Sequence, residues 1–515
     1  MKANEDNSDM MTNMERNIEM REAAETMSLI FETQDMNIFD LFAVLCDHCQ
    51  RCLPAIHRRL VNPEVYKQVD NNAERIRKRA LPRPERAIEP LEKDARQLII
   101  SPLLRATNCT EYDLECYTIL QAIDGLYDMR ARSVMLASFT TTCQRLNLRS
   151  DLGYVYPKQP SPIFELIRKR FGKSGTWGYK AGQLRTATER GIYLRNKLNN
   201  LVWLKTPPGY EVDLGVFDSN TSLCFPNELS EYRIAVVPLV DELSALEIQV
   251  VSKRFRMTGL KQAERVAEKA IAVLRRLGEK GATMVVFAEL CVPELVRNAI
   301  ANALSTGELG TIRMVVAGSF HEWLHDDWYN VAYVLGPWGQ ELWRQTKLQP
   351  YTLMHYEAAS ITALRDYASS NLEEDICTAP RILVVRDTPL GRTVVLICSD
   401  LLNDDPYRQS ILDLGVNFII VPAMTAKLKP EFALAAKHYA IHTQAATVVS
   451  NACAISREVE AGECDATKIS FAFLPGHKPV RWFRCDKCAG PCPSHECCEE
   501  FILSLNNWPF DFERD

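Results

Sequence analysis

The pattern of apolar and polar residues changes about 230 residues into the chain. Residues 15–230 have a mostly helical pattern that is interrupted by proline clusters at 82–90 and 157–162. From residue 232 onward, short apolar runs of strand length follow one another. They cover residues 233–238, 283–288, 313–318, 330–335, 381–385, 393–397, 418–421 and 446–451. Helical segments at 260–277 and 430–446 lie between some of these runs, so the pattern predicts an α/β region with a largely buried sheet.

Three parts are predicted from these changes. We expect residues 1–228 to form a mainly helical N-terminal region of unknown role, residues 229–478 an α/β domain, and residues 479–515 a cysteine-rich tail. The first boundary follows Pro207, Pro208 and Gly209 and a polar stretch at 218–222. The 515 residues are enough for two or more domains with a sizeable buried core.

Composition narrows the classes of protein that the chain can be. With 47% hydrophobic, 24% charged and 9% aromatic residues it matches globular averages, which excludes a wholly disordered, collagenous or coiled-coil chain. The net charge of −6 disfavours attraction of the whole molecule to nucleic acid or to an anionic membrane. Residues 1–29 lack a signal-peptide core, and no apolar run approaches a membrane span. We therefore expect a cytoplasmic protein whose seventeen cysteines are reduced thiols, metal ligands or a nucleophile.

Three ionisable residues come directly after predicted strands. They are Glu289, Lys347 and Cys398. Because the strand ends of a buried sheet present groups on a rigid scaffold, these side chains could converge on one site. There Cys398 would be a nucleophile, Glu289 the base that takes its proton, and Lys347 a positive charge beside the oxyanion and the thiolate. The alternative is a surface ion pair and a small buried thiol.

The sequence around these residues resembles the nitrilase, or carbon-nitrogen hydrolase, superfamily. The resemblance is carried in order by residues 287–290, 329–347 and 396–400, with 415–422 and 435–451 after them, and it extends over residues 232–477. It implies a four-layer αββα sandwich with a triad of Glu289, Lys347 and Cys398. It also implies that Glu357 is a second glutamate that positions the lysine or the substrate, and that the backbone N–H of Ser399 holds the oxyanion.

The activity implied by the resemblance is hydrolysis of a non-peptide carbon-nitrogen bond, in an amide rather than a nitrile, through a thioester on the cysteine. It implies no cofactor for catalysis, and a homo-oligomer. Lys347 is followed by Leu348, Gln349 and Pro350 where the family commonly has His-Leu, so substrate specificity is not carried over. The alternative is a catalytically weak or conditional binding and regulatory module, in a partner complex that contacts nucleic acid or in antiviral defence.

Two cysteine clusters could bind metal. The tail cluster near His495 consists of Cys485, Cys488, Cys492, Cys497 and Cys498. Its Cys-x-x-Cys pair with further ligands nearby fits a structural zinc ion, and the alternative is a solvated tail of free thiols. The second cluster consists of Cys46, His48, Cys49 and Cys52. It lies in an apolar stretch where cysteines serve as small core residues, so we favour a packed helix over a metal site.

A basic segment at residues 168–197 is a candidate partner surface. It includes Arg168, Lys169, Arg170, Lys173 and Trp177. Basic side chains reach phosphates and aromatic rings stack on bases, so the segment is compatible with nucleic-acid or protein binding. A solvated helix face, or a patch that pairs with the acidic N-terminus, is the favoured interpretation.

Overall fold

The computed structural model describes residues 37–82, 90–126, 154–159, 162–163, 194–205, 209–217, 219–403, 407–425, 430–454, 468–475, 480–484 and 502–505. Its contacts divide the chain into two compact units. The first unit comprises residues 1–159, 185–206 and the short segment 413–415, and the second comprises the remainder. Among the described residues, no helix combines the length and the apolar character needed to cross a membrane.

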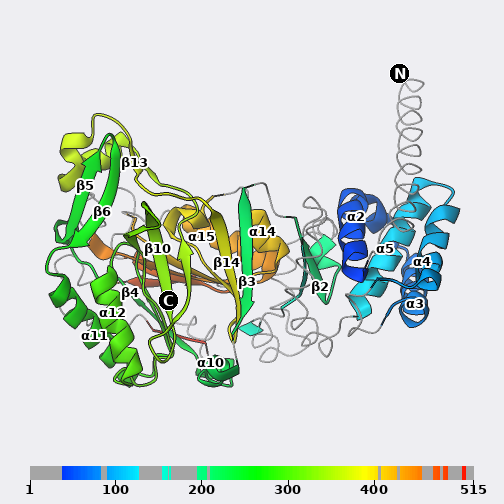
Figure 1. The fold of residues 1–515 in the computed structure, drawn as a ribbon, viewed down its shortest axis with the longest axis horizontal. Coiled ribbons are helices and arrows are strands. Elements are labelled where there is room, and N and C mark those ends of the chain that lie inside the picture. Colours follow the sequence, from blue (N-terminus) through cyan, green and yellow to red (C-terminus); the bar gives the residue numbers. More distant parts are fainter. Residues whose placement is uncertain are drawn as a thin grey trace. The chain divides into compact units, whose positions relative to one another are not determined.

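In the first unit, the described residues form four helices, a 3-10 turn and a two-stranded sheet. They are α2 (Ile38–Leu60), α3 (Pro63–Arg79), α4 (Lys93–Arg105), α5 (Cys109–Leu126), η2 (Leu194–Asn196), β1 (Tyr154–Pro157) and β2 (Leu201–Leu204). Helix α2 begins at Asn37, whose side chain accepts hydrogen bonds from the backbone N–H groups of Phe39 and Asp40. Buried side chains of these helices form one core. Helices make up most of the described part of this unit, as the sequence pattern predicts (Figure 1).

In the second unit, the described strands form two large sheets of seven strands each. The first sheet has the order β11-β10-β8-β7-β4-β20, with β9 paired to β10. Its strands are β4 (Arg233–Val237), β7 (Met284–Phe287), β8 (Met314–Val316), β9 (Phe320–Leu324), β10 (Asp327–Leu335), β11 (Glu341–Thr346) and β20 (Ile502–Ser504). The second sheet has the order β19-β18-β17-β16-β15-β14-β3. Its strands are β3 (Tyr210–Val216), β14 (Arg381–Thr388), β15 (Gly391–Val395), β16 (Phe418–Ala423), β17 (Ala446–Asn451), β18 (Lys468–Phe473) and β19 (Val480–Arg484).

The two sheets pack face to face and helices cover their outer faces. Strand β17 contacts β4 and β7 of the opposite sheet, and β16 also contacts β7. The helices are α10 (Ser219–Leu223), α11 (Ala263–Glu279), α12 (Glu294–Ser305), α13 (His355–Ser360), α14 (Tyr407–Asp413) and α15 (Pro430–Thr443). Helix α11 packs beside α12, and α15 packs on β17 and β18; in Figure 1 the two pairs α11, α12 and α14, α15 lie on opposite sides of the sheets. This is the four-layer αββα sandwich that the resemblance implies.

A small third sheet stands beside the sandwich, and the sequence pattern did not predict it. Its order is β12-β13-β6-β5, with strands β5 (Leu246–Val251), β6 (Arg254–Leu260), β12 (Thr352–Leu353) and β13 (Leu372–Glu374). The short 3-10 turns of the unit are η3 (Leu229–Glu231), η4 (Leu243–Ala245), η5 (Thr362–Tyr367) and η6 (Cys398–Leu401). The helix expected from residue 260 begins at Ala263, because residues 254–260 continue the β5-β6 hairpin.

The strands of the sandwich extend beyond the boundaries expected at residues 228 and 479. Strand β3 lies before the first boundary and pairs in parallel with β14 over seven residues. Beyond the second boundary, β19 pairs with β18 and β20 pairs with β4. The two sheets therefore draw strands from all three parts that the sequence pattern distinguishes.

Candidate active site

Three strand ends of the sandwich place Glu289, Lys347 and Cys398 on one pocket. Glu289 follows β7, Lys347 follows β11 and Cys398 follows β15 at the start of η6. Their exposed fractions are 3%, 3% and 8%. Central strands β4, β7 and β8 run parallel, as do β15, β16 and β17, and their carboxyl ends are where such sheets present reactive groups. The structure therefore excludes the surface ion pair as the explanation for Lys347.

Lys347 lies between two carboxylates. Its Nζ is 2.9 Å from Oε1 of Glu289 and 2.8 Å from Oε2 of Glu374. Asn330, in β10, donates through Nδ2 to both glutamates, at 3.0 Å to Glu289 and 2.9 Å to Glu374. Burial favours the neutral amine, but the two carboxylates outweigh it and hold the pKa of Lys347 well above its usual value. The lysine is therefore a fixed positive charge.

Glu374 is the second glutamate on the lysine, and it was not predicted from the sequence. It is buried at the end of β13, next to the exposed Glu373. Its Oε2 also accepts a hydrogen bond from the backbone N–H of Tyr351 at 2.9 Å. Burial opposes ionisation of Glu374, but Lys347 and His321 reverse this effect and hold its pKa well below the usual range.

His321 fixes the other oxygen of Glu374. Its Nε2 lies 2.9 Å from Oε1 of Glu374, while its Nδ1 lies 2.8 Å from the backbone N of Met257. Because the backbone N–H can only donate, Nδ1 must accept, and the ring proton is then on Nε2, where it donates to Glu374. The histidine thus links the β5-β6 hairpin to the carboxylate that holds the lysine.

Cys398 contacts both Glu289 and the backbone of Met424. The thiol is hydrogen-bonded to the side chain of Glu289 and to the backbone N–H of Met424, which also donates to Oε2 of Glu289 at 3.0 Å. Burial and the negative charge of Glu289 raise the pKa of the Cys398 thiol well above its usual value, although Lys347 acts in the opposite direction. Lys347 thus favours the thiolate, as expected, but burial outweighs its effect and keeps the pKa of the thiol raised.

The backbone around the site is strained at two residues. Cys398 has a φ of 50° and Leu290, which follows Glu289, has a φ of 55°. Residues other than glycine rarely adopt this left-handed conformation, and they keep it only where the surrounding structure enforces it. Backbone strain is thus found at Cys398 and at Leu290, directly after Glu289, and all three residues line the pocket.

Glu357 lines the pocket in a different place from the one expected for a partner of the lysine. One oxygen of its carboxylate accepts from the Tyr351 hydroxyl at 3.1 Å and from the backbone N–H of Met354 at 3.0 Å. The place next to Lys347 is taken by Glu374. Of the two roles that the resemblance implies for Glu357, contact with substrate is the one that its place in the pocket wall favours.

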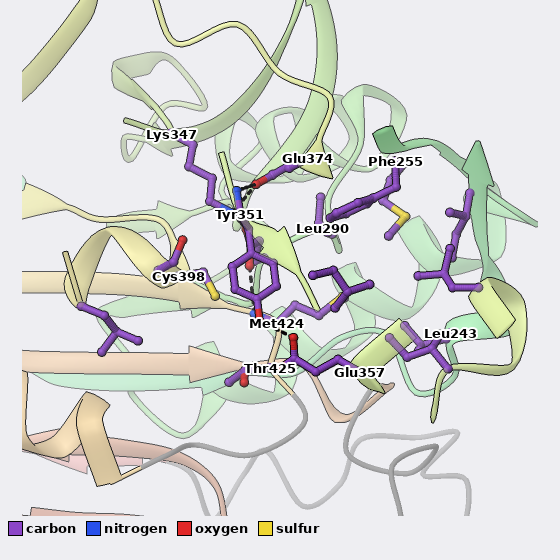
Figure 2. A pocket seen from close by; sticks show the side chains of 18 of the residues that line it. Leu243, Phe255, Leu290, Lys347, Tyr351, Glu357, Glu374, Cys398, Met424 and Thr425 are labelled. Carbon is purple, nitrogen blue, oxygen red and sulfur yellow. Dashed lines mark hydrogen bonds and ion pairs between the residues drawn. The ribbon is translucent and has the colours of Figure 1, made fainter. Parts of the chain in front are cut away.

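The pocket itself has a volume of about 460 Å³, which suits a small-molecule ligand. Ser399 lies in its wall beside the cysteine, as expected, together with Glu289, Lys347 and Glu374. Figure 2 shows Lys347 joined to Glu374 above Tyr351, with Leu243 and Phe255 on the side away from Cys398. Most of the remaining lining is apolar. It consists of Leu243, Ile248, Phe255, Met257, Leu290, Leu353, Ile361, Leu364, Leu402, Met424 and Phe432.

Charge in the pocket is unevenly distributed. Three glutamates line it, and among the described lining residues Lys347 is the one cation. Because both carboxylates beside it already engage that lysine, the apolar part of the pocket offers no positive charge to an acidic substrate. The site therefore favours a ligand that is uncharged in its apolar portion.

Two groups of predicted site residues lie outside the described residues. They are the tail cysteines Cys485, Cys488, Cys492, Cys497 and Cys498, and the basic set Arg168, Lys169, Arg170, Lys173 and Trp177. A zinc ion in the tail and a nucleic-acid or protein surface at 168–197 stay predictions. The cluster at Cys46 does lie in a packed helix, since Cys46 and Cys49 are fully buried in the core of the first unit.

A family model for carbon-nitrogen hydrolases matches residues 256–486. This region of the chain, a little under half of its residues, is therefore similar to the carbon-nitrogen hydrolase family. The matched region contains Glu289, Asn330, Lys347 and Glu374 of the buried network, as well as Cys398. No curated protein matches the sequence of the chain.

Solved structures of a Nesterenkonia amidase are similar to part of this chain. A mutant of the AN1 amidase from the nitrilase superfamily is 13% identical, with 49% of this chain and 87% of that chain covered and a TM-score of 0.34. A double mutant in complex with acrylamide is 14% identical, with 50% and 88% covered and a TM-score of 0.35. A mutant showing covalent addition of the acetamide moiety of fluoroacetamide at its active-site cysteine is 14% identical, with 50% and 92% covered and a TM-score of 0.32. The similarity to the carbon-nitrogen hydrolase family rests on the family model alone.

Proposed function

We propose that the chain hydrolyses an amide whose acyl part is apolar, with Cys398 as the nucleophile. The observation that carries the proposal is the contact of Cys398 with Glu289, which is itself paired with the buried Lys347. A carboxylate within hydrogen-bond reach of a protonated thiol is placed to take its proton as the sulfur attacks. The family supplies the reaction class, hydrolysis of a carbon-nitrogen bond.

The reaction proceeds in two halves. The Cys398 sulfur bonds to the amide carbon while its proton passes to Glu289, and Lys347 with the backbone N–H of Ser399 stabilises the oxyanion. Protonated Glu289 then gives its proton to the leaving nitrogen, the carbon-nitrogen bond breaks, and a thioester remains. Glu289 next takes a proton from water, whose oxygen attacks the thioester. The acid leaves and the proton returns to the thiol.

Because the resting cysteine is a neutral thiol, proton transfer accompanies attack instead of preceding it. The raised pKa of Cys398 and the ionised pair around Lys347 fit this order. Lys347 cannot serve as the base, since its raised pKa keeps it protonated. The base is therefore Glu289, and Glu374 holds the lysine in place.

The apolar lining supports the choice of acyl group. Each methylene that leaves water for an apolar wall contributes about 0.8 kcal/mol, or roughly a fourfold change in kcat/KM. Leu243 and Phe255 stand on the side of the pocket away from Cys398, and Ile248 also lines the pocket. A straight-chain acyl group that starts at the cysteine would reach them.

A series of primary amides tests the proposal through ammonia release. Acetamide, butanamide and hexanamide should show kcat/KM rising about threefold to fourfold per methylene, and an amide of equal length that ends in a carboxylate should be poor. Cys398→Ala should abolish turnover, while Cys453→Ala, at a buried cysteine outside the pocket lining, should retain it. Intact mass should show an acyl adduct on the wild type and none on Cys398→Ala. Equal turnover by both cysteine variants would overturn the mechanism, and a flat chain-length series would overturn the apolar substrate alone.

A further inference from the structure

The cysteine cluster of α2 divides into a buried part and an open part. Cys46 and Cys49 are fully buried in the core of the first unit. His48 and Cys52 project instead toward α5, where they meet Asp113. The side chains of His48 and Asp113 are 20% and 14% exposed, and Cys52 is half-buried. Core packing explains Cys46 and Cys49 and accounts in part for Cys52, which packs against the same core, but it does not explain His48 and Asp113.

The three side chains bring a nitrogen of His48, the sulfur of Cys52 and an oxygen of Asp113 close together. One potential ligand atom from each residue lies within 4.8 Å of the other two. His48 Nε2 is 2.8 Å from Oδ1 of Asp113. His48 and Cys52 stand one turn apart on α2, and this i, i+4 spacing puts both side chains on the same face of the helix.

We propose that His48, Cys52 and Asp113 bind a divalent cation of the zinc type. Zinc takes nitrogen, sulfur and oxygen ligands at about 2.0–2.3 Å, which in a tetrahedron separates the ligand atoms by roughly 3.3–3.8 Å. The three atoms need to move by about an ångström or less to reach that arrangement. Three protein ligands leave a fourth position, which the partial exposure of the site opens to water.

The hydrogen bonds seen in this cluster are those of a site whose ligands still carry their protons. A proton shared between His48 and Asp113 stands where the cation would be, and the Cys52 thiol donates to the carbonyl oxygen of His48 at 3.3 Å. Binding the cation requires loss of the thiol proton and of the Nε2 proton, so both hydrogen bonds are replaced by bonds to the metal. The helix positions His48 and Cys52 in advance, and α5 adds Asp113.

Hard cations do not suit this set of ligands. Mg²⁺ and Ca²⁺ prefer sites made of oxygen atoms, and only Asp113 offers a side-chain oxygen here. The soft sulfur of Cys52 and the imidazole of His48 favour Zn²⁺ and its spectroscopic substitute Co²⁺. We therefore expect Zn²⁺ and Co²⁺ to bind at this site, and Mg²⁺ and Ca²⁺ not to bind there.

Cobalt binding to the full chain tests the site. The background protein carries serine at the five tail cysteines, because the tail is a separate candidate for zinc. After chelation of resident metal, Co²⁺ should bind with one equivalent and produce the near-ultraviolet charge-transfer absorption of a cobalt-sulfur bond. Zn²⁺ should displace it and Mg²⁺ should not. Cys52→Ser should remove the absorption, and Asp113→Asn should weaken binding by at least about tenfold.

Control variants separate loss of a ligand from loss of the fold. Cys109→Ser, at a half-buried cysteine of the same helix as Asp113, and Asp47→Asn, beside His48, should both bind Co²⁺ like the parent. Helical circular dichroism should be unchanged in Cys52→Ser; if it is lost, His48→Gln replaces it.

A second measurement needs no variant. Zn²⁺ should slow alkylation of Cys52 in the wild type, as read by peptide mapping, and leave Cys109 unaffected. Absence of the charge-transfer band, an unchanged band in Cys52→Ser, or alkylation of Cys52 that ignores Zn²⁺ would overturn the proposal.

Discussion

At the scale of single residues, the site depends on one lysine held by two carboxylates. Glu289 also touches the nucleophile, whereas Glu374 contacts Lys347, His321 and the backbone of Tyr351. In the proposed mechanism the two glutamates therefore have different roles: Glu289 moves a proton, and Glu374 keeps the lysine charged and in place. Their substitution should give different kinetic signatures.

Glu374→Gln removes one of the two charges that hold Lys347. We expect kcat to fall by about 10-fold to 100-fold with KM little changed, since the lysine is needed most when the oxyanion develops. Steady-state kinetics on the best amide of the series measures both constants. The matched control is Glu373→Gln at the exposed neighbour, which contacts Arg254 at 3.8 Å and should be unaffected. A rise in KM at constant kcat would instead assign Glu374 to substrate binding.

Asp400 makes stability depend on pH. It is fully buried, its Oδ2 accepts from the backbone N–H groups of Leu348 and Ile397, and burial raises its pKa from 3.8 to about 7. Between these values the unfolded chain has lost a proton that the folded protein keeps. Stability therefore falls as pH rises from about 4 to about 7, and the loss is complete above about 7.

The Asp400→Asn variant removes this titration. Between pH 5 and pH 8 the free energy of unfolding of the wild type should fall, relative to the variant, by about 2 to 3 kcal/mol. Urea unfolding at the two pH values gives the difference. Asp326→Asn, in an exposed turn, should follow the wild type. If wild type and Asp400→Asn change in parallel, Asp400 does not titrate in this range.

The sequence predicted three residues of the site but not Glu374 or His321, and the difference has a physical reason. Glu289, Lys347 and Cys398 each follow an apolar run, so the strand pattern places them at strand ends. Glu374 stands among neighbouring acids, and only the alternation of β13, with Leu372 and Glu374 buried and Glu373 exposed, distinguishes it. Because that strand has only three residues, its alternation is too short to be recognised in the sequence. His321 gives no signal, because its partners are 53 and 64 residues away.

At the scale of elements, the turn between β8 and β9 closes on the end of β7, just before Glu289. Gly318 in this turn has a φ of +58°, and a Cβ there would stand 2.1 Å from the carbonyl oxygen of Ala288. Only a residue without a side chain permits that approach. The position of the base thus depends on a glycine in a neighbouring element.

Gly318→Ala should therefore lower the free energy of unfolding by more than backbone strain alone would. Gly307→Ala, at a φ of +77° with open space around it, should cost about 1 to 2 kcal/mol from strain. Gly318→Ala should cost a further 1 to 3 kcal/mol, roughly, from the clash, and should lower kcat as Glu289 moves. Urea unfolding and amide turnover measure the two effects. Equal losses of stability in both variants would show that the turn relaxes without disturbing β7.

The small sheet shows where element prediction failed. In β5 and β6, buried or half-buried apolar residues alternate with more exposed residues over a short and interrupted stretch. Strand β6 also contains the charged residues Arg254 and Arg256. Sequence periodicity therefore resembles a loop there, although the longer runs of β7, β16 and β17 were found because both of their faces are buried.

At the scale of the whole molecule, the sandwich begins earlier than the change of pattern suggests. Strand β3 covers the edge of β14 through parallel pairing from Tyr210 to Val216, and Arg386 contacts both the carbonyl and the carboxylate of Asp213. Its alternating, partly exposed side chains give it no apolar run, so the expected boundary at residue 228 separates it from its sheet. The homo-oligomer implied by the resemblance stays a prediction at this scale.

Two truncations test the position of the boundary. A fragment that starts at residue 209 keeps β3, whereas one that starts at residue 229 uncovers the edge of β14. Uncovered strand edges pair between molecules, so the shorter fragment should show lower soluble yield and larger particles in size-exclusion chromatography than the longer one. Equal behaviour of the two fragments would mean that β3 is dispensable to the sheet.

The left-handed backbone at Leu290 and Cys398 has a consequence for any attempt to evolve this protein. Glycine at either position would relax the backbone, so selection for thermal tolerance alone would reward Cys398→Gly, which has no sulfur with which to react. Selection for thermal stability therefore favours glycine at position 398, whereas selection for turnover favours cysteine there. A library screened on heat resistance should thus accumulate well-folded, inert descendants unless each round also demands product.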